Sequence, residues 1–339
     1  MIIAIDGYEA NVSKRVGIGR YAYEILKNIY EEVRGQRSEV RKKKDLLFWI
    51  YLPNAPLPDM PAATDWWHYR VIRPRRFWTY IGLPLALWLN RPRADVIFSP
   101  THYVPRFITI PRVMAIMDLS YLEFPQMFRT RDLHQLIHWT RYSVQRAGKI
   151  LTISRFSKNA IIKAYSVPPT RVVVTYPGLT MSDVRSQMSE VRRTYDLGSR
   201  YILSVGTLQP RKNYSRLIEA FSRLVKQEKG FDDVELVIVG KKGWLYEEIL
   251  NAPRQFGVEN RVKFLAFVPD ADLPALYRHA LCFTLVSLYE GFGLPVLEAM
   301  ANGCPVVVSS VSSLPEIGGK AGIYVDPHDV TSIVSGLAK

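Results

Sequence analysis

Short apolar runs alternate with longer amphipathic segments along the whole chain of 339 residues. Apolar runs without helical spacing are typical of strands that are buried on both faces of a sheet. The segments between them carry apolar residues three and four positions apart, which is the spacing of one helix face. This repeated alternation of strand and helix predicts an α/β fold with mostly parallel sheets.

The alternation runs through the first half of the chain, is interrupted, and then begins again. The predicted strands of the first half are residues 2–5, 46–52, 95–99, 113–117, 150–153 and 172–175, and the predicted helices are 20–32, 129–149 and 154–165. Tyr176-Pro177-Gly178 has the composition of a hinge. The predicted strands of the second half are 201–205, 234–239, 261–267, 281–286 and 305–309. We therefore expect one domain over residues 1–177 and a second over 178–339.

The most informative stretch is residues 285–305, LVSLYEGFGLPVLEAMANGCP. A predicted strand ends here, glycines follow, and a helix begins with a proline in its first turn. Glu290 precedes the glycines, and Glu298 lies in the second turn of the helix. Glycines at a helix N-terminus favour anions, but two carboxylates would repel phosphate and suit neutral hydroxyls such as those of a ribose or a sugar. From spacing alone, a strand–turn–helix unit with solvated acids is an equal alternative.

A second group of candidates lies in the loop GTLQPRKN, residues 206–213, directly after a predicted strand. Arg211 and Lys212 are adjacent cations beside a turn. A guanidinium and an ammonium group together suit a diphosphate. Two basic residues in a loop are usually only solvated, so the acids downstream decide between these interpretations.

Together, EGFGLPVLEAMANGCPVV and GTLQPRKN resemble the donor-site motifs of the retaining family-four glycosyltransferases. That family has the GT-B fold, in which two Rossmann-like domains face each other across a cleft. The resemblance implies transfer of a hexose, with mannose as a first guess, from a nucleoside diphosphate sugar to a hydroxyl acceptor. The acceptor would be a glycan or a lipid-linked molecule in surface polysaccharide or glycolipid synthesis.

The resemblance also assigns roles to residues. It implies that Glu290 faces the transferred sugar, that Glu298 binds the ribose hydroxyls, and that Arg211 and Lys212 neutralise the diphosphate. The further donor-site residues that it implies are Gly291, Phe292, Gly293 and Leu294 in the turn, Gly17 and Gly19 in the first glycine loop, and Val268 and Leu273 beside the base. Relatives usually continue into a last helix that crosses back onto the first domain, and we expect this chain to lack it.

Two candidates follow predicted strands of the first domain, where ligands bind in open α/β sheets. Relatives commonly carry His-Asp where this chain has Met117-Asp118, so Asp118 stays a catalytic candidate. His102, in the adjacent loop, is the candidate imidazole, with a solvated loop histidine as the alternative. No cluster of histidines and cysteines indicates a metal site, and we expect no metal and no cofactor.

The net positive charge of the chain lies entirely in its first half. Residues 1–180 contain 27 Lys and Arg against 13 Asp and Glu, a net charge of +14, whereas residues 181–339 contain 18 of each. This asymmetry suggests a polyanion, either nucleic acid or an anionic membrane surface. No nucleic-acid-binding motif is found, so we expect no nucleic acid.

Residues 66–89 combine four tryptophans with arginines. The favoured interpretation is a core helix that covers the sheet. The alternative is an interfacial patch, with aromatic side chains at the headgroups and arginines on anionic lipid. The apolar part, 77–90, is too short to span a bilayer.

Cys282 and Cys304 lie in apolar runs and predict buried thiols in a reducing compartment. The first residues, MIIAIDG, lack the features of a signal peptide. We therefore expect a cytoplasmic protein, with the inner face of the cell membrane as a candidate location. Two other functions stay open: a nucleotide-sugar epimerase or phosphorylase on the same fold, and a basic nucleic-acid-binding protein.

Overall fold

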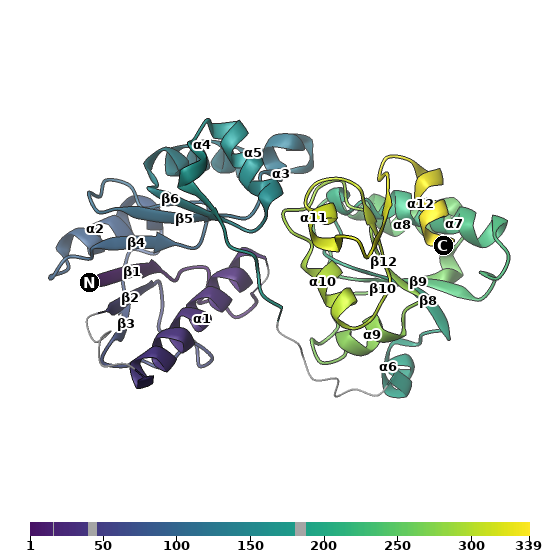
Figure 1. Ribbon diagram of the computed structural model, residues 1–339, viewed down its shortest axis with the longest axis horizontal. Helices are drawn as coiled ribbons and strands as arrows, with labels where there is room; N and C mark the ends of the chain where they lie inside the picture. Colours follow the sequence, from purple (N-terminus) through teal and green to yellow (C-terminus); the bar gives the residue numbers. More distant parts are fainter. Residues whose placement is uncertain (16, 40–45, 180–187) are drawn as a thin grey trace. The chain divides into compact units, whose positions relative to one another are not determined.

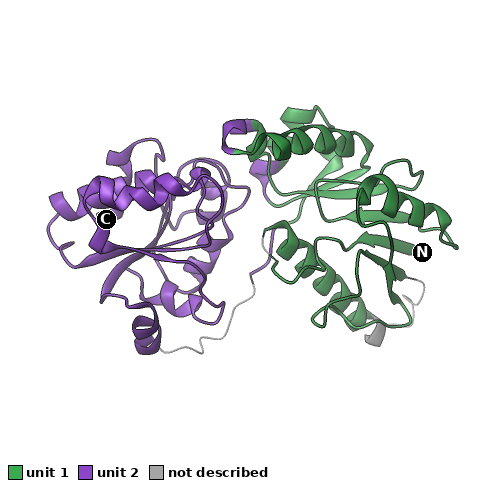
Figure 2. Cartoon of the chain, turned by 180° about the vertical axis from the view of Figure 1, so that it is seen from behind, with its two compact units in different colours: residues 1–122, 128–153, 158–175 green, residues 123–127, 154–157, 176–339 purple. Residues whose placement is uncertain are grey.

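The computed structural model describes residues 1–15, 17–39, 46–179 and 188–339 (Figure 1). The chain forms two compact units, which Figure 2 distinguishes by colour. Unit 1 comprises Met1–Leu122, Phe128–Ile153 and Lys158–Thr175, and unit 2 comprises Glu123–Met127, Ser154–Ser157 and Tyr176–Lys339. Each unit is built around one parallel sheet, which confirms the predicted α/β class.

Within the described residues, unit 1 contains a seven-stranded parallel sheet in the order β3-β2-β1-β4-β5-β6-β7. The strands are β1 (Ile2–Asp6), β2 (Leu47–Leu52), β3 (Trp67–Val71), β4 (Val96–Ser99), β5 (Arg112–Ile116), β6 (Lys149–Thr152) and β7 (Val172–Val174). The helices of this half of the chain are α1 (Ile18–Glu39), the π-helix η2 (Trp78–Gly82), α2 (Leu83–Leu89), α3 (Ser120–Glu123), α4 (Thr130–Arg146) and α5 (Arg155–Tyr165).

The side chains of β2 explain why its sequence reads as one apolar run. Phe48 and Ile50 pack in the same cluster as Leu26 of α1. Trp49 and Tyr51, which alternate with them, belong to the cluster that contains the side chains of η2 and α2. Because successive side chains of a strand point to opposite faces, a sheet that is covered on both faces needs apolar residues at every position.

The structure differs from two predictions for the first half. The helix predicted over 20–32 is longer, because α1 continues to Glu39 through Arg, Glu and Gln, which are good helix formers. Residues 40–45 lie outside the described residues. The expected core helix over 66–89 begins instead as the edge strand β3. Trp67, Tyr69 and Val71 alternate there with polar residues, which favours a strand.

Unit 2 contains, in the part that the structure describes, a six-stranded parallel sheet in the order β10-β9-β8-β11-β12-β13. The strands are β8 (Arg200–Val205), β9 (Val234–Val239), β10 (Val262–Leu265), β11 (Cys282–Leu285), β12 (Val306–Ser309) and β13 (Gly322–Val325). The helices are α6 (Met188–Tyr195), α7 (Tyr214–Gln227), α8 (Glu247–Phe256), α9 (Leu273–His279), α10 (Leu294–Ala301), α11 (Leu314–Gly318) and α12 (Val330–Leu337). Helices α6, α11 and α12 and strand β13 were not predicted.

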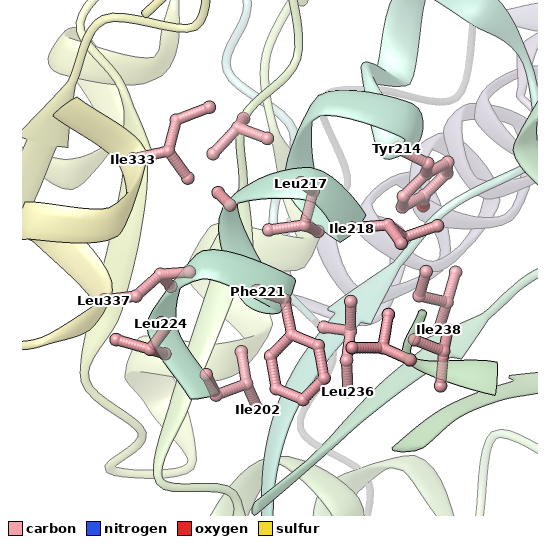
Figure 3. Packing of buried hydrophobic residues seen from close by; sticks show 14 of the residues in the cluster. Ile202, Tyr214, Leu217, Ile218, Phe221, Leu224, Leu236, Ile238, Ile333 and Leu337 are labelled. Carbon is pink, nitrogen blue, oxygen red and sulfur yellow. The ribbon is translucent and has the colours of Figure 1, made fainter. Parts of the chain in front are cut away.

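Helix α7 provides the main contact on one face of this sheet. Its side chains Leu217, Phe221 and Leu224 are fully buried, and Figure 3 shows them above Ile202 of β8 and Leu236 of β9. Residues of α12 complete the same cluster. Burial of a Leu or Phe side chain stabilises a fold by about 1.5–3 kcal/mol, so this cluster holds the loops at the ends of β8 and β9 in place.

The strand order reverses at one point in each sheet. In unit 2 the reversal falls between β8 and β11, and in unit 1 between β1 and β4. The loops that follow such a pair of strands diverge, and ligands bind in the crevice at their carboxyl ends. These two places are where a functional site is expected.

Candidate functional site

The two motifs singled out in the sequence meet in unit 2 between β8 and β11, where the strand order reverses. We call this place the switch point of unit 2, and the place between β1 and β4 the switch point of unit 1. Arg211 and Lys212 lie in a short 3₁₀ turn, Pro210–Lys212, in the loop that follows β8. Glu290 lies in the loop that follows β11, the neighbouring strand. These residues are far apart in the sequence and come together because β8 and β11 are paired.

Both cations contact the carboxylate of Glu290. The Lys212 ammonium donates to Oε1 at 2.6 Å, and the Arg211 guanidinium donates to Oε2 at 3.1 Å. Glu290 is 7% exposed and Lys212 is 9% exposed. Burial alone would raise the pKa of Glu290, but the charges of Lys212 and Arg211 lower this pKa to about 2. Glu290 is therefore ionised at neutral pH, between two cations.

Asn213 fixes the loop that carries the cations. Its backbone is left-handed, with φ of 61°, and it precedes α7 as the N-cap residue. Its side-chain amide donates to the carbonyl groups of Val286, at 3.0 Å, and Pro327, at 2.7 Å. The backbone N–H of Leu288 donates to the carbonyl of Arg211 at 2.9 Å. Hydrogen bonds from residues adjacent to the ion pairs thus join the loops after β8 and β11.

A glycine lets a third loop approach the same place. Gly240, directly after β9, lies so close to Gly206 that a Cβ atom would stand 1.9 Å from the carbonyl oxygen of Gly206. The backbone N–H of Gly206 donates to the carbonyl of Val239 at 2.8 Å. No residue with a side chain fits at Gly240 without moving the loop that holds the cations.

The turn between Glu290 and α10 is held by two serines. The N–H of Glu290 donates to Ser312 Oγ at 3.0 Å. Ser313 Oγ lies 2.9 Å from the carbonyl oxygen of Glu290 and 2.8 Å from that of Phe292, and the two oxygens share its single hydroxyl hydrogen. Gly293 caps the helix with φ of 104°, which favours glycine. Gly291 and Phe292 are buried beside it, and Leu294 begins the helix.

Glu298 lies on α10 and contacts a tyrosine that sequence reasoning missed. Tyr277 on α9 donates its hydroxyl to Glu298 Oε2 at 2.8 Å. Burial, and then the charge of Glu298, raise the pKa of Tyr277 well above its usual value. Val268 is buried, Leu273 is half-buried, and both pack in the apolar cluster that contains Tyr277. The structure thus brings the candidates for ribose and base binding together on one side of the sheet.

The candidates in unit 1 lie in the loops of its own sheet. Gly17 has φ of 51°, and its carbonyl accepts the N–H of Tyr21 in the first turn of α1, where Gly19 also lies. The expected role of these glycines beside a donor diphosphate stays a prediction.

His102 and Asp118 are near each other at the carboxyl ends of β4 and β5. His102 Nε2 accepts the N–H of Met117 at 3.4 Å, which requires the neutral ring. Burial lowers the pKa of His102, while the charge of Asp118 opposes that change. Asp118 Oδ1 also accepts the N–H of Ser120 at 2.9 Å, at the start of α3. His102 is thus half-buried and hydrogen-bonded, rather than a solvated loop histidine.

Asp6 is a further candidate that sequence reasoning missed. It ends β1 at the switch point of unit 1 and is 2% exposed. Its Oδ1 accepts the indole N–H of Trp78 at 2.9 Å and the N–H of Tyr8 at 3.2 Å. Burial raises the pKa of Asp6 to about 7, and Glu9 adds to this increase. The sequence does contain a signal for this candidate, because Asp6 directly follows the apolar run 2–5, where the predicted strand ends.

Asp6→Asn is expected to stabilise the protein more at pH 8 than at pH 4. The folded chain keeps the Asp6 proton up to about pH 7, whereas the unfolded chain loses it near 3.8, so wild-type stability falls as pH rises through this window by roughly 4 kcal/mol. Asparagine does not titrate and can still accept from Trp78. Urea unfolding of both proteins at the two pH values measures the difference. An equal difference at both would contradict the assigned pKa.

Among the described residues, no group of three or more His, Cys, Asp or Glu side chains is placed to hold a metal ion. An Asp-x-Asp pattern occurs at Asp270 and Asp272, but Asp272 accepts the hydroxyl of Tyr195 at 2.8 Å. The prediction that no metal is needed stays a prediction.

Comparison with known proteins places this arrangement in a family. The family described as "Glycosyl transferases group 1" matches residues 190–339. The O-antigen chain mannosyltransferase B of Escherichia coli is 32% identical to this chain, over an alignment that covers 94% of this chain and 84% of that protein. The O-antigen chain mannosyltransferase RfbU of Salmonella typhimurium is 26% identical, with 78% of this chain and 70% of that protein covered.

Solved structures agree on the fold. HepE of Anabaena, in complex with UDP and glucose, superposes with a TM-score of 0.70 and 20% identity, over 98% of this chain and 88% of that chain. The sucrose-phosphate synthase of Thermosynechococcus elongatus gives a TM-score of 0.69 at 15% identity, over 99% of this chain and 88% of that chain. The chain is therefore a glycosyltransferase that belongs to the group 1 family and has the GT-B fold.

Proposed function

We propose that this glycosyltransferase moves a hexose, with mannose as the first candidate, from a nucleoside diphosphate sugar to a hydroxyl of a growing surface glycan or of a lipid-linked acceptor. The observation that carries the proposal is the buried cluster of Lys212, Arg211 and Glu290 at the switch point of unit 2. The names of the two mannosyltransferase relatives support mannose and a role in surface polysaccharide synthesis.

The diphosphate of the donor binds beside Arg211 and Lys212. Both cations stand in a loop whose backbone is fixed, so they need no reorganisation when negative charge develops on the leaving group. The N-terminus of α10 adds a favourable dipole. Glu298, held by the hydroxyl of Tyr277, accepts the ribose hydroxyls. In this arrangement the cations bind the negatively charged diphosphate of the donor, and the carboxylates bind its neutral hydroxyl groups.

The sugar is transferred with retained anomeric configuration and without an enzymic nucleophile. Glu290 is the nearest acid to the cations, but its carboxylate is engaged by Lys212 and Arg211 and has a pKa of about 2. So weak a base is a poor nucleophile. The acceptor hydroxyl therefore attacks from the face that the diphosphate leaves, the leaving phosphate takes the acceptor proton, and Glu290 orients the sugar.

Glu298→Gln is expected to weaken donor binding roughly 10- to 100-fold, because hydrogen bonds to a charged group contribute about 1.5–3 kcal/mol and the amide replaces only part of this. Tyr277→Phe keeps the carboxylate and removes only the hydroxyl at 2.8 Å, so its effect should be smaller. Titration calorimetry with the nucleotide sugar that binds best measures both. An affinity within twofold of wild type for Glu298→Gln would exclude this role.

A thermal-shift panel of nucleotide sugars tests the donor assignment. A donor at 100 times its dissociation constant adds about 2.7 kcal/mol to the stability of the folded state, which is a clear shift of the melting temperature. The panel includes GDP-mannose and UDP-glucose. The proposal would be contradicted if none of the nucleotide sugars raised the melting temperature. Release of nucleoside diphosphate only in the presence of an acceptor separates a transferase from an epimerase.

A further inference from the structure

The outward side of η2 and α2 exposes large apolar side chains. We name these residues the α2 face: Phe77, Ile81, Leu85, Trp88 and Leu89. Each is between 46% and 60% exposed. At about 100° per residue, the last four fall within an arc of about 100° of the helix surface. The apolar side chains thus form a continuous stripe and are not scattered around the helix.

The opposite side of the same helices is fixed in the core of unit 1. Trp78, Leu83 and Leu87 are buried in the cluster that contains Trp49 and Tyr51 of β2. In addition, the indole N–H of Trp78 donates to Asp6 at 2.9 Å. The helices that carry the α2 face are therefore packed firmly against the core of unit 1.

Arginines precede and follow η2 and α2 in the sequence, and no acid lies among them. Residues 66–94 contain six arginines and no Asp or Glu. These arginines, all exposed, are Arg70, Arg73, Arg75, Arg76, Arg91 and Arg93. Within the part of the chain that the structure describes, none of the six forms an ion pair with a carboxylate. Their charge is thus available to an external anion.

A second segment exposes an aromatic side chain beside these helices. The N–H of Arg106 donates to the carbonyl of Thr79 in η2 at 2.9 Å. The next residue, Phe107, is 80% exposed and has φ of 56°. The Arg112 side chain holds this loop, because it donates to the carbonyl groups of Pro105 at 3.2 Å and Ile108 at 2.6 Å. The loop therefore presents Phe107 in a fixed conformation.

We propose that the α2 face, Phe107 and the six arginines dock unit 1 on an anionic lipid bilayer. An amphipathic helix with apolar side chains on one side and basic residues around them lies in the interface plane. The helices are too short to span it, and no helix among the described residues has the length and hydropathy to do so. A nucleic acid would leave the apolar stripe unused, and a second copy would bring arginines against arginines.

Docking would place the loop edge of the first sheet at the lipid surface. Phe77 begins the α2 face, and the adjacent Trp78 contacts Asp6 at the carboxyl end of β1. The Arg75 guanidinium lies 6.0 Å from the ring centre of Tyr8, in the loop after β1. An acceptor with a lipid anchor would then reach this edge from the membrane. This consequence, unlike the docking itself, rests on the proposed function.

Co-sedimentation with vesicles tests the docking without any substrate. The vesicles contain either phosphatidylglycerol in phosphatidylcholine, or phosphatidylcholine alone. Wild type should sediment with the anionic vesicles only, and binding should weaken as salt rises, because the Debye length is about 8 Å at physiological salt. Arg75→Gln, Arg76→Gln and Arg93→Gln together should lower binding on the order of 100-fold, at about fivefold for each basic residue.

Two further variants sharpen the test. Trp88→Gln with Leu89→Gln should lower binding to anionic vesicles with the arginines intact, because the apolar part is lost. Arg254→Gln, Arg278→Gln and Lys320→Gln together remove the same charge from exposed positions in unit 2 and should have no effect. Circular dichroism confirms folding of each variant.

Two results would overturn docking that depends on charge. One is equal binding of wild type to neutral and anionic vesicles. The other is a loss of vesicle binding in the unit 2 control that equals the loss in the triple arginine variant of unit 1. Dimers in sedimentation velocity that Trp88→Gln dissolves, without vesicle binding, would assign the α2 face to a second copy. Salt-sensitive binding of single-stranded RNA in place of vesicles would assign it to nucleic acid. Vesicle binding without donor binding would leave the docking intact and refute only the proposed function.

Discussion

Lys212→Ala is expected to lower turnover by about 10²–10³-fold, the usual loss when one group that stabilises the charge of a leaving group is removed. The Lys212 ammonium is buried, 2.6 Å from Glu290, and remains in the fixed loop after β8. Its interaction strengthens as the sugar–phosphate bond breaks, so kcat should fall more than the donor affinity.

Lys241→Ala is the matched control for this variant. Lys241 lies in the neighbouring loop after β9, and its side chain is exposed. Removal of this lysine changes the net charge of unit 2 by the same amount. Nucleoside diphosphate release, measured with acceptor present, should be near wild type in Lys241→Ala. Wild-type turnover in a folded Lys212→Ala would remove the diphosphate assignment.

Glu290→Ala is expected to destabilise unit 2 by about 3–5 kcal/mol, because it leaves buried cations without their counter-charge. Arg211 keeps its bond to the carbonyl of Tyr289, so the Lys212 ammonium bears most of the cost. Urea unfolding at pH 7 measures the loss, with the exposed Glu228→Ala as the control. A change below 1 kcal/mol would show that the ion pairs do not hold the loops.

The same ion pairs predict a dependence on acid. The pKa of Glu290 is lowered from 4.5 to about 2, so its contribution to stability is present above pH 4.5 and is lost as pH falls towards 2. Glu290→Gln does not titrate at this position. The difference in unfolding free energy between wild type and Glu290→Gln should therefore decrease over this range.

Much of the fold could be predicted, because its strands are buried on both faces. The runs 2–5 and 201–205 became β1 and β8 with ends that differ by one residue. Strand β3 is an edge strand, in which His68 and Arg70 alternate with apolar residues. This alternation favours a strand, but it differs from the continuous apolar runs of the inner strands, and β3 was missed. Three of the four tryptophans of residues 66–89 are buried, whereas α2 exposes apolar side chains to solvent. The composition of this segment could not show which of its apolar residues are buried and which are exposed.

The candidate site was predicted where its residues are close together in the sequence. Glu290, Glu298, Arg211 and Lys212 stand in two short motifs, and the family that these motifs suggested is confirmed. Their pairing could not be predicted, because the contact between Lys212 and Glu290 joins residues 78 positions apart. Such contacts depend on which strands are neighbours in the sheet, and no local pattern shows this.

Titration calorimetry of nucleotide sugars into wild type and Lys212→Ala tests the central claim, that the switch point of unit 2 is the donor site. We expect one donor molecule to bind per chain of wild type, and to bind at least tenfold more weakly to Lys212→Ala and to Glu298→Gln. GDP-mannose and UDP-glucose are titrated separately. Saturable binding with equal affinity in wild type and both variants would place the donor elsewhere and contradict the account.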